Sequence, residues 1–274
     1  MSPTVSIIVP SFNRPALLAE AVASVWDQTY PFWQLIVVDD GSGTDMLTYL
    51  DTLTADRRIE VIRRPHRGIA AARNIGLDHA TGDYVAFLDS DDRYWPEKLA
   101  LQVAGLEAQP AVGWSYTGFR LVDDHGIEVP FAFRPPPIPH DPDSLVQDLI
   151  ATRTTIALPT VMMRRLVTVR FDERLPRAED YDVLIQLAQR SPSARVKKVL
   201  YDVREHEART TKEPSLTHIG KAMVYKKTAR SVEADLRVLC RRRQGEHLRA
   251  FLRAQVKRRD LRGAVSWWSA YLAV

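Results

Sequence analysis

Cysteine is nearly absent from this sequence of 274 residues, and long apolar runs are missing altogether. Cys240 is the single cysteine, so no disulfide can form within the chain, as is typical of a reducing compartment. No stretch approaches the roughly 20 apolar residues of a membrane-spanning helix. The first apolar run, residues 5–9, is too short for a signal peptide and lacks a basic segment before it. We therefore expect a cytoplasmic protein, and contact with the inner face of a membrane stays open.

No charge of one sign dominates the whole chain, whose formal net charge is only +4, but the charges are unevenly placed. Residues 201–274 carry 17 Lys and Arg against 8 Asp and Glu, whereas residues 1–200 carry 21 against 26. A basic C-terminal segment on a mildly acidic body favours either an anionic partner for that segment or a solvated helical surface. The hydrophobic and charged fractions, 45% and 26%, are ordinary for a folded protein and argue against disorder.

The first hundred residues alternate between short β-branched runs and segments of helical periodicity. This alternation predicts a mainly parallel sheet between helices, with ligands beyond the carboxyl ends of the strands. The predicted strands are 5–9, 35–38, 59–62 and 84–88, and the predicted helices are one from Pro15 and those at 45–53, 68–80 and 96–108. Farther along we expect strands at 114–122, 157–163 and 196–203, a proline-stiffened loop around 135–142, a helix at 178–190 and helical structure from residue 215.

Three carboxylates follow the fourth predicted strand in the segment YVAFLDSDDRYWP. In an extended chain residues i and i+2 point to the same side, so Asp89 and Asp91 are expected to aim at one point. Crowded carboxylates are costly to bury without a cation, and oxygen ligands favour Mg²⁺ or Mn²⁺. Asp92 is interpreted as a turn residue or as a cap of the helix that follows.

Two common nucleotide-binding motifs are missing. Gly41 and Gly43 follow a strand, but Met46 stands where the third glycine of G-x-G-x-x-G would be, and no P-loop sequence is present. Asp39 would repel a pyrophosphate but can accept hydrogen bonds from a base or a ribose. Hydride transfer and P-loop chemistry are therefore disfavoured.

Two arginines flank the start of the predicted helix at 68–80, where an anion would be attracted. Arg67 is the better candidate for a phosphate or base contact. Arg73 lies deeper in the helix and could instead pair with Asp83 or Asp89.

Three segments together resemble family 2 of the inverting GT-A glycosyltransferases, over about residues 4–210. They are VSIIVPSFNRPALLAEAVASVWDQTYPFWQLIVVDDGS, RGIAAARNIGLDHATGDYVAFLDSDD and RAEDYDVLIQLA. The resemblance implies a GT-A fold of class α/β, Rossmann-like, with a mixed, mainly parallel sheet between helices. It implies a glycosyltransferase domain at 1–210, with a nucleotide-sugar half at about 1–110 and an acceptor half at 111–210. Residues 211–274 would form a basic helical extension.

The resemblance also assigns roles to individual residues. Asp89-Ser90-Asp91 matches the D-x-D motif, so Asp91, Asp89 and the later His206 are expected to hold the divalent metal. Glu179-Asp180 matches the E-D pair, with Asp180 as general base and Glu179 beside it to orient the acceptor. The expected nucleotide contacts are Pro10, Ser11, Phe12, Asn13, Arg14, Asp39, Arg67, Arg73, Asp89 and Ser90.

The implied activity is transfer of a sugar, with inversion, from a nucleoside-diphosphate sugar to an acceptor hydroxyl, with Mn²⁺ or Mg²⁺ as cofactor. UDP is the expected nucleotide. The acceptor would be a sugar, a lipid-linked molecule or another small molecule in surface polysaccharide or glycoconjugate synthesis. Two alternatives are a nucleotidyltransferase, disfavoured because PSFNRP replaces its glycine-rich basic loop, and a non-catalytic nucleotide-binding or membrane-adaptor protein whose basic helices rest on an anionic membrane. No motif for nucleic-acid recognition is found.

Overall fold

Two compact units make up the chain. The computed structural model describes residues 2–129, 144–205, 214–258 and 261–274. Unit 1 comprises Met1–Arg134, Ile156–Arg170 and Arg190–His206, and unit 2 comprises Pro135–Thr155, Phe171–Gln189 and Glu207–Val274. The functional division expected from the sequence, into a domain at 1–210 and a basic extension at 211–274, stays a prediction.

Unit 1 is an α/β layer structure in which the predicted alternation of strands and helices is confirmed. Its strands are β1 (Val5–Ser11), β2 (Trp33–Asp39), β3 (Ile59–Arg63), β4 (Tyr84–Phe87), β5 (Arg93–Tyr94), β6 (Trp114–Val122), β7 (Val161–Arg164) and β8 (Ser193–Arg204). Its α-helices are α1 (Pro15–Trp26), α2 (Thr44–Leu53), α3 (Ile69–His79) and α4 (Lys98–Glu107).

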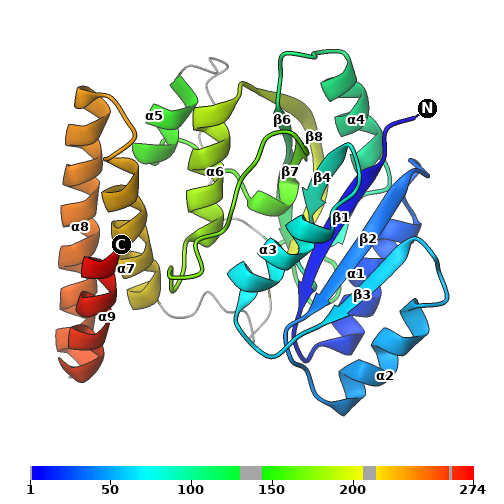
Figure 1. Cartoon of the computed structure of the whole chain (residues 1–274), viewed down its shortest axis with the longest axis horizontal. Helices are drawn as coiled ribbons and strands as arrows, with labels where there is room; N and C mark the ends of the chain where they lie inside the picture. Colours follow the sequence, from blue (N-terminus) through cyan, green and yellow to red (C-terminus); the bar gives the residue numbers. More distant parts are fainter. Residues whose placement is uncertain (1, 130–143, 206–213, 259–260) are drawn as a thin grey trace. The chain divides into compact units, whose positions relative to one another are not determined.

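The strands form one mixed sheet in the order β3-β2-β1-β4-β7-β6-β8-β5, and its first four strands are blue to cyan in Figure 1. Strands β1, β2, β3 and β4 run parallel. Strand β7 is antiparallel to both β4 and β6, and β8 is parallel to β6. The carboxyl ends of β1, β2, β4, β6 and β8 therefore lie at the same edge of the sheet, where the fold leads us to look for a site.

Helices cover both faces of this sheet, as continuous apolar strands require. Apolar side chains of α1, α2 and α4 join one buried cluster with Ile7 and Leu35. Helix α3 lies against the other face (Figure 1), where Gly76 permits a close approach: a Cβ on Gly76 would lie 2.3 Å from the Ile8 side chain. The glycine thus sets how closely α3 packs on β1.

At three places the structure differs from what the sequence predicts. The segment at 157–163 begins with a 3₁₀ helix, η2 (Leu158–Thr160), and only then becomes β7. Pro159 explains this start, because proline lacks the N–H that a strand ladder needs. The two-residue strand β5 and the short helix α5 (Leu145–Ile150) were not predicted; both are too short to show a clear periodicity.

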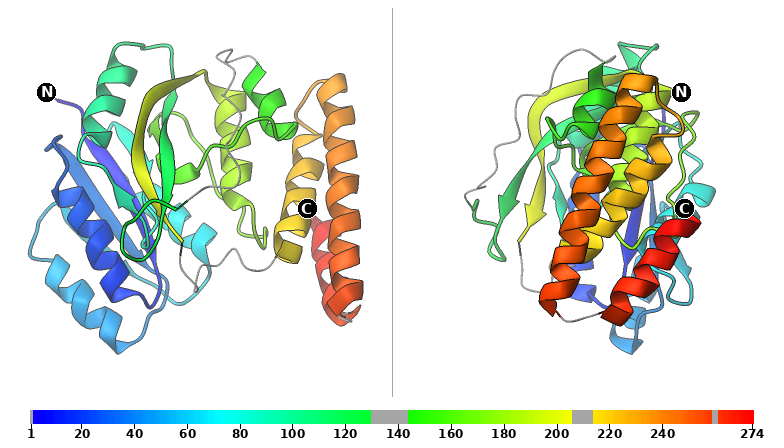
Figure 2. Two further views of the ribbon diagram at one scale, coloured as in Figure 1. Left: turned by 180° about the vertical axis from the view of Figure 1, so that it is seen from behind. Right: turned by 90° about the vertical axis from the view of Figure 1, so that its left-hand side faces the viewer.

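Unit 2 is helical. It contains α5, α6 (Glu179–Arg190), α7 (Pro214–Thr228), α8 (Ala234–Arg258) and α9 (Leu261–Ala273). Figure 2 shows α7, α8 and α9 side by side, and Tyr225 of α7 and Cys240 of α8 share a buried cluster. The helical structure expected from residue 215 onward is confirmed for 214–228, 234–258 and 261–273. Within the described ranges, no helix combines the length and apolar character needed to cross a membrane.

Candidate active site

Two buried polar side chains meet where β1 and β2 end. Ser11 and Asp39 are partners in the strand register, and they are only 3% and 2% exposed. Among the described residues, neither Ser11 Oγ nor Asp39 Oδ1 has a hydrogen-bond partner. Buried polar atoms are normally paired, because an unpaired one costs about 1–3 kcal/mol. This pair therefore offers acceptor and donor capacity to a ligand at the sheet edge.

Asn13 connects the loops that follow β1 and β2. Its backbone is left-handed (φ 51°), which asparagine tolerates better than most residues. Its N–H donates to Ser42 Oγ (2.9 Å) and its Oδ1 accepts from Gly43 N–H (2.8 Å). Ser42 N–H in turn donates to Asp39 Oδ2 (3.3 Å). Asn13 and Ser42 thus hold the Asp39 carboxylate in place. Asn13, one of the predicted nucleotide contacts, therefore uses its hydrogen bonds to fix the loop.

Asp40 fixes the loop that leads into α3. Its two carboxylate oxygens accept from the N–H groups of Arg67 and Gly68, each at 2.8 Å. The ring of His66 lies 4.7 Å from that of Phe12, and both side chains are exposed. The predicted residues Phe12 and Arg67 are thereby brought to the same edge as Asp39. The two rings form an exposed aromatic pair in the loops that follow β1 and β3.

The acidic segment after β4 is a turn and not an extended strand. Asp92 N–H donates to Asp89 C=O (3.1 Å), so the chain reverses across Ser90 and Asp91. The expectation of an extended chain is wrong at this point. Each carboxylate instead contacts an arginine: Arg73 Nη2 lies 2.8 Å from Asp89 Oδ1, and Arg14 Nη1 lies 2.8 Å from Asp91 Oδ2.

These two ion pairs join the turn to the rest of the sheet edge. Arg73, whose side chain is 4% exposed, pairs with Asp89, which settles the choice between Asp83 and Asp89. Arg14 lies directly before α1 and reaches across to the turn. The side chains of Asp89 and Asp91 stay 30% and 17% exposed, so the carboxylates remain accessible from solvent.

Asp92 fixes the acidic turn to strand β8. It is 5% exposed and accepts from Tyr201 Oη (2.6 Å) and from the backbone N–H of Arg204 (2.8 Å). Burial raises the pKa of Asp92 well above its usual value, and the negative charges of Asp89 and Asp91 raise this pKa further. The interpretation of Asp92 as a turn residue is confirmed, and its side chain is fixed by β8, more than a hundred residues away.

Arg204 extends this anchor. Its guanidinium donates to the carbonyl oxygens of Asp91 (3.2 Å) and Asp124 (3.1 Å) and contacts Glu20 of α1. The residue is 5% exposed at the carboxyl end of β8. It was not predicted, and only its position at the end of a strand could have indicated a role.

In unit 2, the predicted catalytic pair Glu179 and Asp180 opens helix α6. Both side chains are partly exposed. The adjacent Tyr181 holds this end of the helix: its hydroxyl donates to Leu149 C=O (2.7 Å) and lies 3.2 Å from the Tyr225 hydroxyl. Acidic side chains in the first turn are favourable with the helix dipole.

The backbone before α6 is unusual. Ala178 is left-handed (φ 68°), which is uncommon for a residue with a Cβ. A Cβ on Gly220 of α7 would lie 2.1 Å from Arg177 C=O, so glycine permits this segment to pack directly on α7. Strain of this kind is found where a structure holds a functional segment in place, and here it precedes Asp180. His206, the third predicted metal ligand, lies outside the described residues.

The sequence profile described as "Glycosyl transferase family 2" matches residues 6–167, which include the ends of β1, β2 and β4 and the acidic turn described above. The chain belongs to glycosyl transferase family 2. The resemblance stated from the sequence is therefore confirmed.

Curated relatives of this family 2 chain are bacterial glycosyltransferases. TuaG of Bacillus subtilis, named for teichuronic acid biosynthesis, is 38% identical over 60% of this chain and 63% of its own. WfgD of Escherichia coli, named as a UDP-Glc:α-D-GlcNAc-diphosphoundecaprenol β-1,3-glucosyltransferase, is 29% identical over 65% of this chain and 66% of its own. The chain spans about a third (33%) of a longer Rickettsia felis relative and under two thirds (63%) of TuaG.

Solved structures confirm the GT-A fold. Staphylococcus aureus TarS (residues 1–349) in complex with UDP-GlcNAc superposes with a TM-score of 0.71 over 97% of this chain and 79% of its own, at 20% identity. The mannosyltransferase PcManGT of Pyrobaculum calidifontis, solved with GDP-Man and Mn²⁺, gives 0.62 over 100% and 81%, also at 20% identity. At these identities the likeness concerns the fold.

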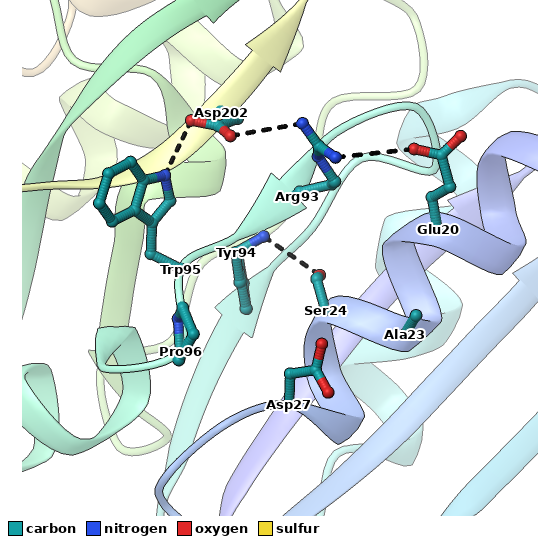
Figure 3. A pocket seen from close by; sticks show the side chains of 9 residues that line it. All are labelled: Glu20, Ala23, Ser24, Asp27, Arg93, Tyr94, Trp95, Pro96 and Asp202. Atoms are coloured by element: carbon teal, nitrogen blue, oxygen red, sulfur yellow. Dashed lines mark hydrogen bonds and ion pairs between the residues drawn. The ribbon is translucent and has the colours of Figure 1, made fainter. Parts of the chain in front are cut away.

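A cavity of about 410 Å³ lies elsewhere in unit 1 of this family 2 chain, between α1, β5 and β8 (Figure 3). Arg93 stands in it between Glu20 (3.9 Å) and Asp202 (3.6 Å), and Asp202 also accepts from Trp95 Nε1 (2.8 Å). None of the described residues predicted to bind nucleotide or metal lines it. The cavity shares Glu20 with the contacts of Arg204.

Proposed function

We propose that this chain transfers a sugar, with inversion, from a nucleoside-diphosphate sugar to an acceptor hydroxyl. The observation that carries the proposal is a pair of buried atoms, Ser11 Oγ and Asp39 Oδ1, that have no partner in the described part of the chain and lie at the same sheet edge as the accessible acidic turn. In a family 2 chain, such a pair is suited to the polar edge of a nucleoside. The turn then lies where a diphosphate would follow, one strand away at the same edge.

UDP is the nucleotide that we propose. The uracil N3–H is a single donor that a carboxylate oxygen such as Asp39 Oδ1 can accept, while the exposed ring of Phe12 is available for stacking. The printed names of WfgD and of the TarS complex support UDP-linked donors. PcManGT was solved with GDP-Man, so the test must include guanine.

Asp89 and Asp91 are the described residues suited to a divalent metal. Their carboxylates supply oxygen ligands of the kind that Mg²⁺ and Mn²⁺ prefer, and both are accessible. In the described ranges no group of three or more acidic, His or Cys side chains converges, so diphosphate oxygens, water and the predicted His206 would complete the shell. When bound, the metal would neutralise the charge of the departing diphosphate.

In this proposal, helix α6 carries the two side chains that act on the acceptor. We assign Asp180 as the general base that takes the proton from the acceptor hydroxyl, because a carboxylate within about 2.6–3.2 Å of such a hydroxyl can do so. Glu179 points in a different direction, since neighbours on a helix diverge by about 100°. It would orient a second hydroxyl of the acceptor. The family membership and the braced start of α6 support this assignment.

For the acceptor we propose a sugar on a lipid carrier, at the cytoplasmic side of the membrane. WfgD is named for transfer to a diphosphoundecaprenol-linked sugar, and TuaG for teichuronic acid biosynthesis. Both names fit assembly of a surface polysaccharide. A water-soluble analogue of such an acceptor should therefore also be a substrate.

The experiment that tests this function is a thermal-shift panel of UDP, GDP and dTDP, each with Mn²⁺, with Mg²⁺ and with a chelator. UDP with metal should raise the melting temperature most, because a ligand that binds only the folded state stabilises it. Stabilisation by none of the nucleotides would refute the proposal. A larger shift with GDP would refute only the assignment of the base.

A further inference from the structure

The outward face of α8 carries large apolar side chains in a row. Val238, Leu252 and Val256 are 68%, 45% and 68% exposed. At 100° per residue, these positions lie within an arc of about 40° of the helix. Of the buried residues of α8, Cys240 and Phe251 lie on the opposite side of the helix and Gln255 lies on its flank. The row is therefore a second apolar stripe, which the packing of unit 2 does not use.

Helix α9 carries a second set of exposed apolar side chains. Among its described side chains, the large exposed apolar ones are Val265 (68%), Trp268 (41%) and Leu272 (61%). Figure 2 (right) shows α8 and α9 side by side in front of α7. The C-terminal end of α9 is fixed to α7, because Lys226 Nζ donates to Tyr271 C=O (2.9 Å) and Arg230 Nη1 to Val274 C=O (2.7 Å). Unit 2 thus holds both apolar rows in place.

Cations surround the apolar row of α8. Four exposed arginines, Arg241, Arg242, Arg249 and Arg253, fall within about 60° of Val238 on the helix. The acidic residues of α8 are Asp235, at its first turn, and Glu246, which lies on the flank and pairs with Arg242 and Arg243. Residues 234–274 contain ten Lys and Arg against three Asp and Glu. A face that only needed to be soluble would mix charges of both signs.

We propose that this face, defined by the six apolar residues and four arginines named above and called the α8–α9 face, rests on an anionic lipid bilayer. Aliphatic side chains and Trp268 would enter the headgroup region while the arginines contact lipid phosphates, as in amphipathic helices that lie in the interface. The inference deepens the proposed function by naming what holds the enzyme near a lipid-linked acceptor, but it uses no residue of the nucleotide site.

The charges and side chains of the α8–α9 face disfavour two other partners, a second copy of the chain and a nucleic acid. A second copy bound through the same face would bring the two sets of arginines together, and like charges repel. Nucleic acid would pair with the arginines, but its binding relies on aromatic stacking and hydrogen bonds, whereas five of the six apolar residues of this face are Val or Leu. A bilayer satisfies both the apolar and the cationic part of the face.

The test is flotation of the full chain with two kinds of vesicle, pure phosphatidylcholine and phosphatidylcholine with roughly a third phosphatidylglycerol. Binding is expected to the anionic vesicles only, and it should weaken at least tenfold between about 0.1 and about 0.5 M NaCl, as screening increases. Two double variants should each lose tenfold or more: Arg249→Glu with Arg253→Glu, and Leu252→Ser with Val256→Ser. All four positions are exposed, so folding should persist, which thermal unfolding checks.

The matched control is Arg57→Glu with Lys197→Glu, the same charge change at exposed positions of unit 1. It should bind vesicles like the wild type. Failure of the folded wild type to bind anionic vesicles would overturn the proposal, as would equal binding by the control and the α8–α9 variants. Binding of RNA or formation of a dimer that these same variants abolish, without vesicle binding, would also overturn it. UDP stabilisation and transfer to a water-soluble acceptor should be unchanged in every variant, which separates this inference from the proposed function.

Discussion

Arg204 donates its backbone N–H to Asp92 Oδ1 at 2.8 Å, and this bond joins the end of β8 to the acidic turn after β4. The guanidinium of the same residue donates to Asp91 C=O (3.2 Å) and contacts Glu20. One buried arginine therefore holds both the backbone of the turn and the helix behind it. We infer that Arg204 is a positioning residue for Asp89 and Asp91.

Replacing Arg204 by Met should leave the protein folded but loosen the turn. The backbone bond to Asp92 and the bond from Tyr201 to Asp92 remain, whereas the contacts to Asp91, Asp124 and Glu20 are lost. Removing a residue that orients a metal ligand typically lowers metal affinity or activity by about 10–100-fold. We expect the half-saturating Mn²⁺ concentration and the KM for the donor to rise in this range.

Arg204→Lys should recover part of this loss, because an ammonium can make one of the guanidinium's contacts. Arg195→Met, on the same strand, is the control and should leave both constants unchanged. Steady-state kinetics with varied donor and metal would measure them. A folded Arg204→Met protein with wild-type constants would show that the turn needs no support from β8.

Asp39→Asn should weaken binding of the nucleoside. The carboxylate Oδ1 is a buried acceptor that has no hydrogen-bond partner among the described residues, and a hydrogen bond to a charged group contributes about 1.5–3 kcal/mol. The corresponding increase in the UDP dissociation constant is about 10- to 150-fold. Calorimetric titration of UDP with Mn²⁺ would measure it.

Asp45→Asn provides the comparison, since Asp45 is an exposed acid in the first turn of α2. This variant should bind UDP as the wild type does. Ser11→Ala should weaken binding less than Asp39→Asn, because a neutral hydroxyl makes a weaker bond. If Asp39→Asn bound UDP with unchanged affinity, the nucleoside would have to lie elsewhere.

The sequence predicted unit 1 well because its information there is local. Strands β1, β2 and β4 each contain a short apolar run, and the polar residues Ser11 and Asp39 are the last residues of β1 and β2. The position of Asp92 in a turn was predicted, but the contacts of its side chain could not be, because they involve Tyr201 and Arg204, which are distant in the sequence. The extended geometry expected for Asp89 and Asp91 failed for a related reason: a strand pattern says where apolar residues stop, but not that the chain then turns.

Lys98 gives a prediction about stability and pH. It is fully buried, its Nζ donates to Gln102 Oε1 (2.6 Å), and burial lowers its pKa from 10.5 to about 7. As pH falls from about 10.5 to about 7, the unfolded chain takes up this proton before the folded chain does. The native state therefore loses stability across that window and loses no more from Lys98 below it. At about 1.4 kcal/mol per pKa unit, the penalty approaches about 5 kcal/mol at neutral pH.

Lys98→Met should remove this penalty but leave Gln102 Oε1 without its donor, at a cost of about 1–3 kcal/mol. The variant should thus be more stable than the wild type at pH 7, by about 2–4 kcal/mol, and less stable near pH 10. Urea unfolding at both pH values would show the change of sign. Lys197→Met, at an exposed position, should show no such crossing. A difference that is independent of pH would mean that Lys98 keeps an ordinary pKa.

Asp180 and Asp182 lie two residues apart on α6, and the same substitution at each should have opposite consequences. Asp182 is 2% exposed and accepts from Lys227 Nζ and Gln186 Nε2, both at 2.7 Å. Asp182→Asn should lower stability by about 1–3 kcal/mol, since it removes the nearer of the two carboxylates that Lys227 contacts and leaves only Asp172 at 3.5 Å. Transfer should persist in the folded fraction. Asp180→Asn should keep its stability and its affinity for UDP.

What Asp180→Asn should lose is turnover. Without a base, the acceptor hydroxyl keeps its proton during attack, and removal of general-base catalysis typically costs about 10²–10⁴-fold. Glu179→Gln should act mainly on the KM for the acceptor, because its proposed role is to orient a second hydroxyl. Single-turnover transfer to a water-soluble acceptor, with donor binding measured in parallel, separates these effects. Full turnover by Asp180→Asn would show that Asp180 is not the general base. The same conclusion would follow if Asp182→Asn lost as much turnover as Asp180→Asn after correction for the folded fraction. The base would then have to lie on another element.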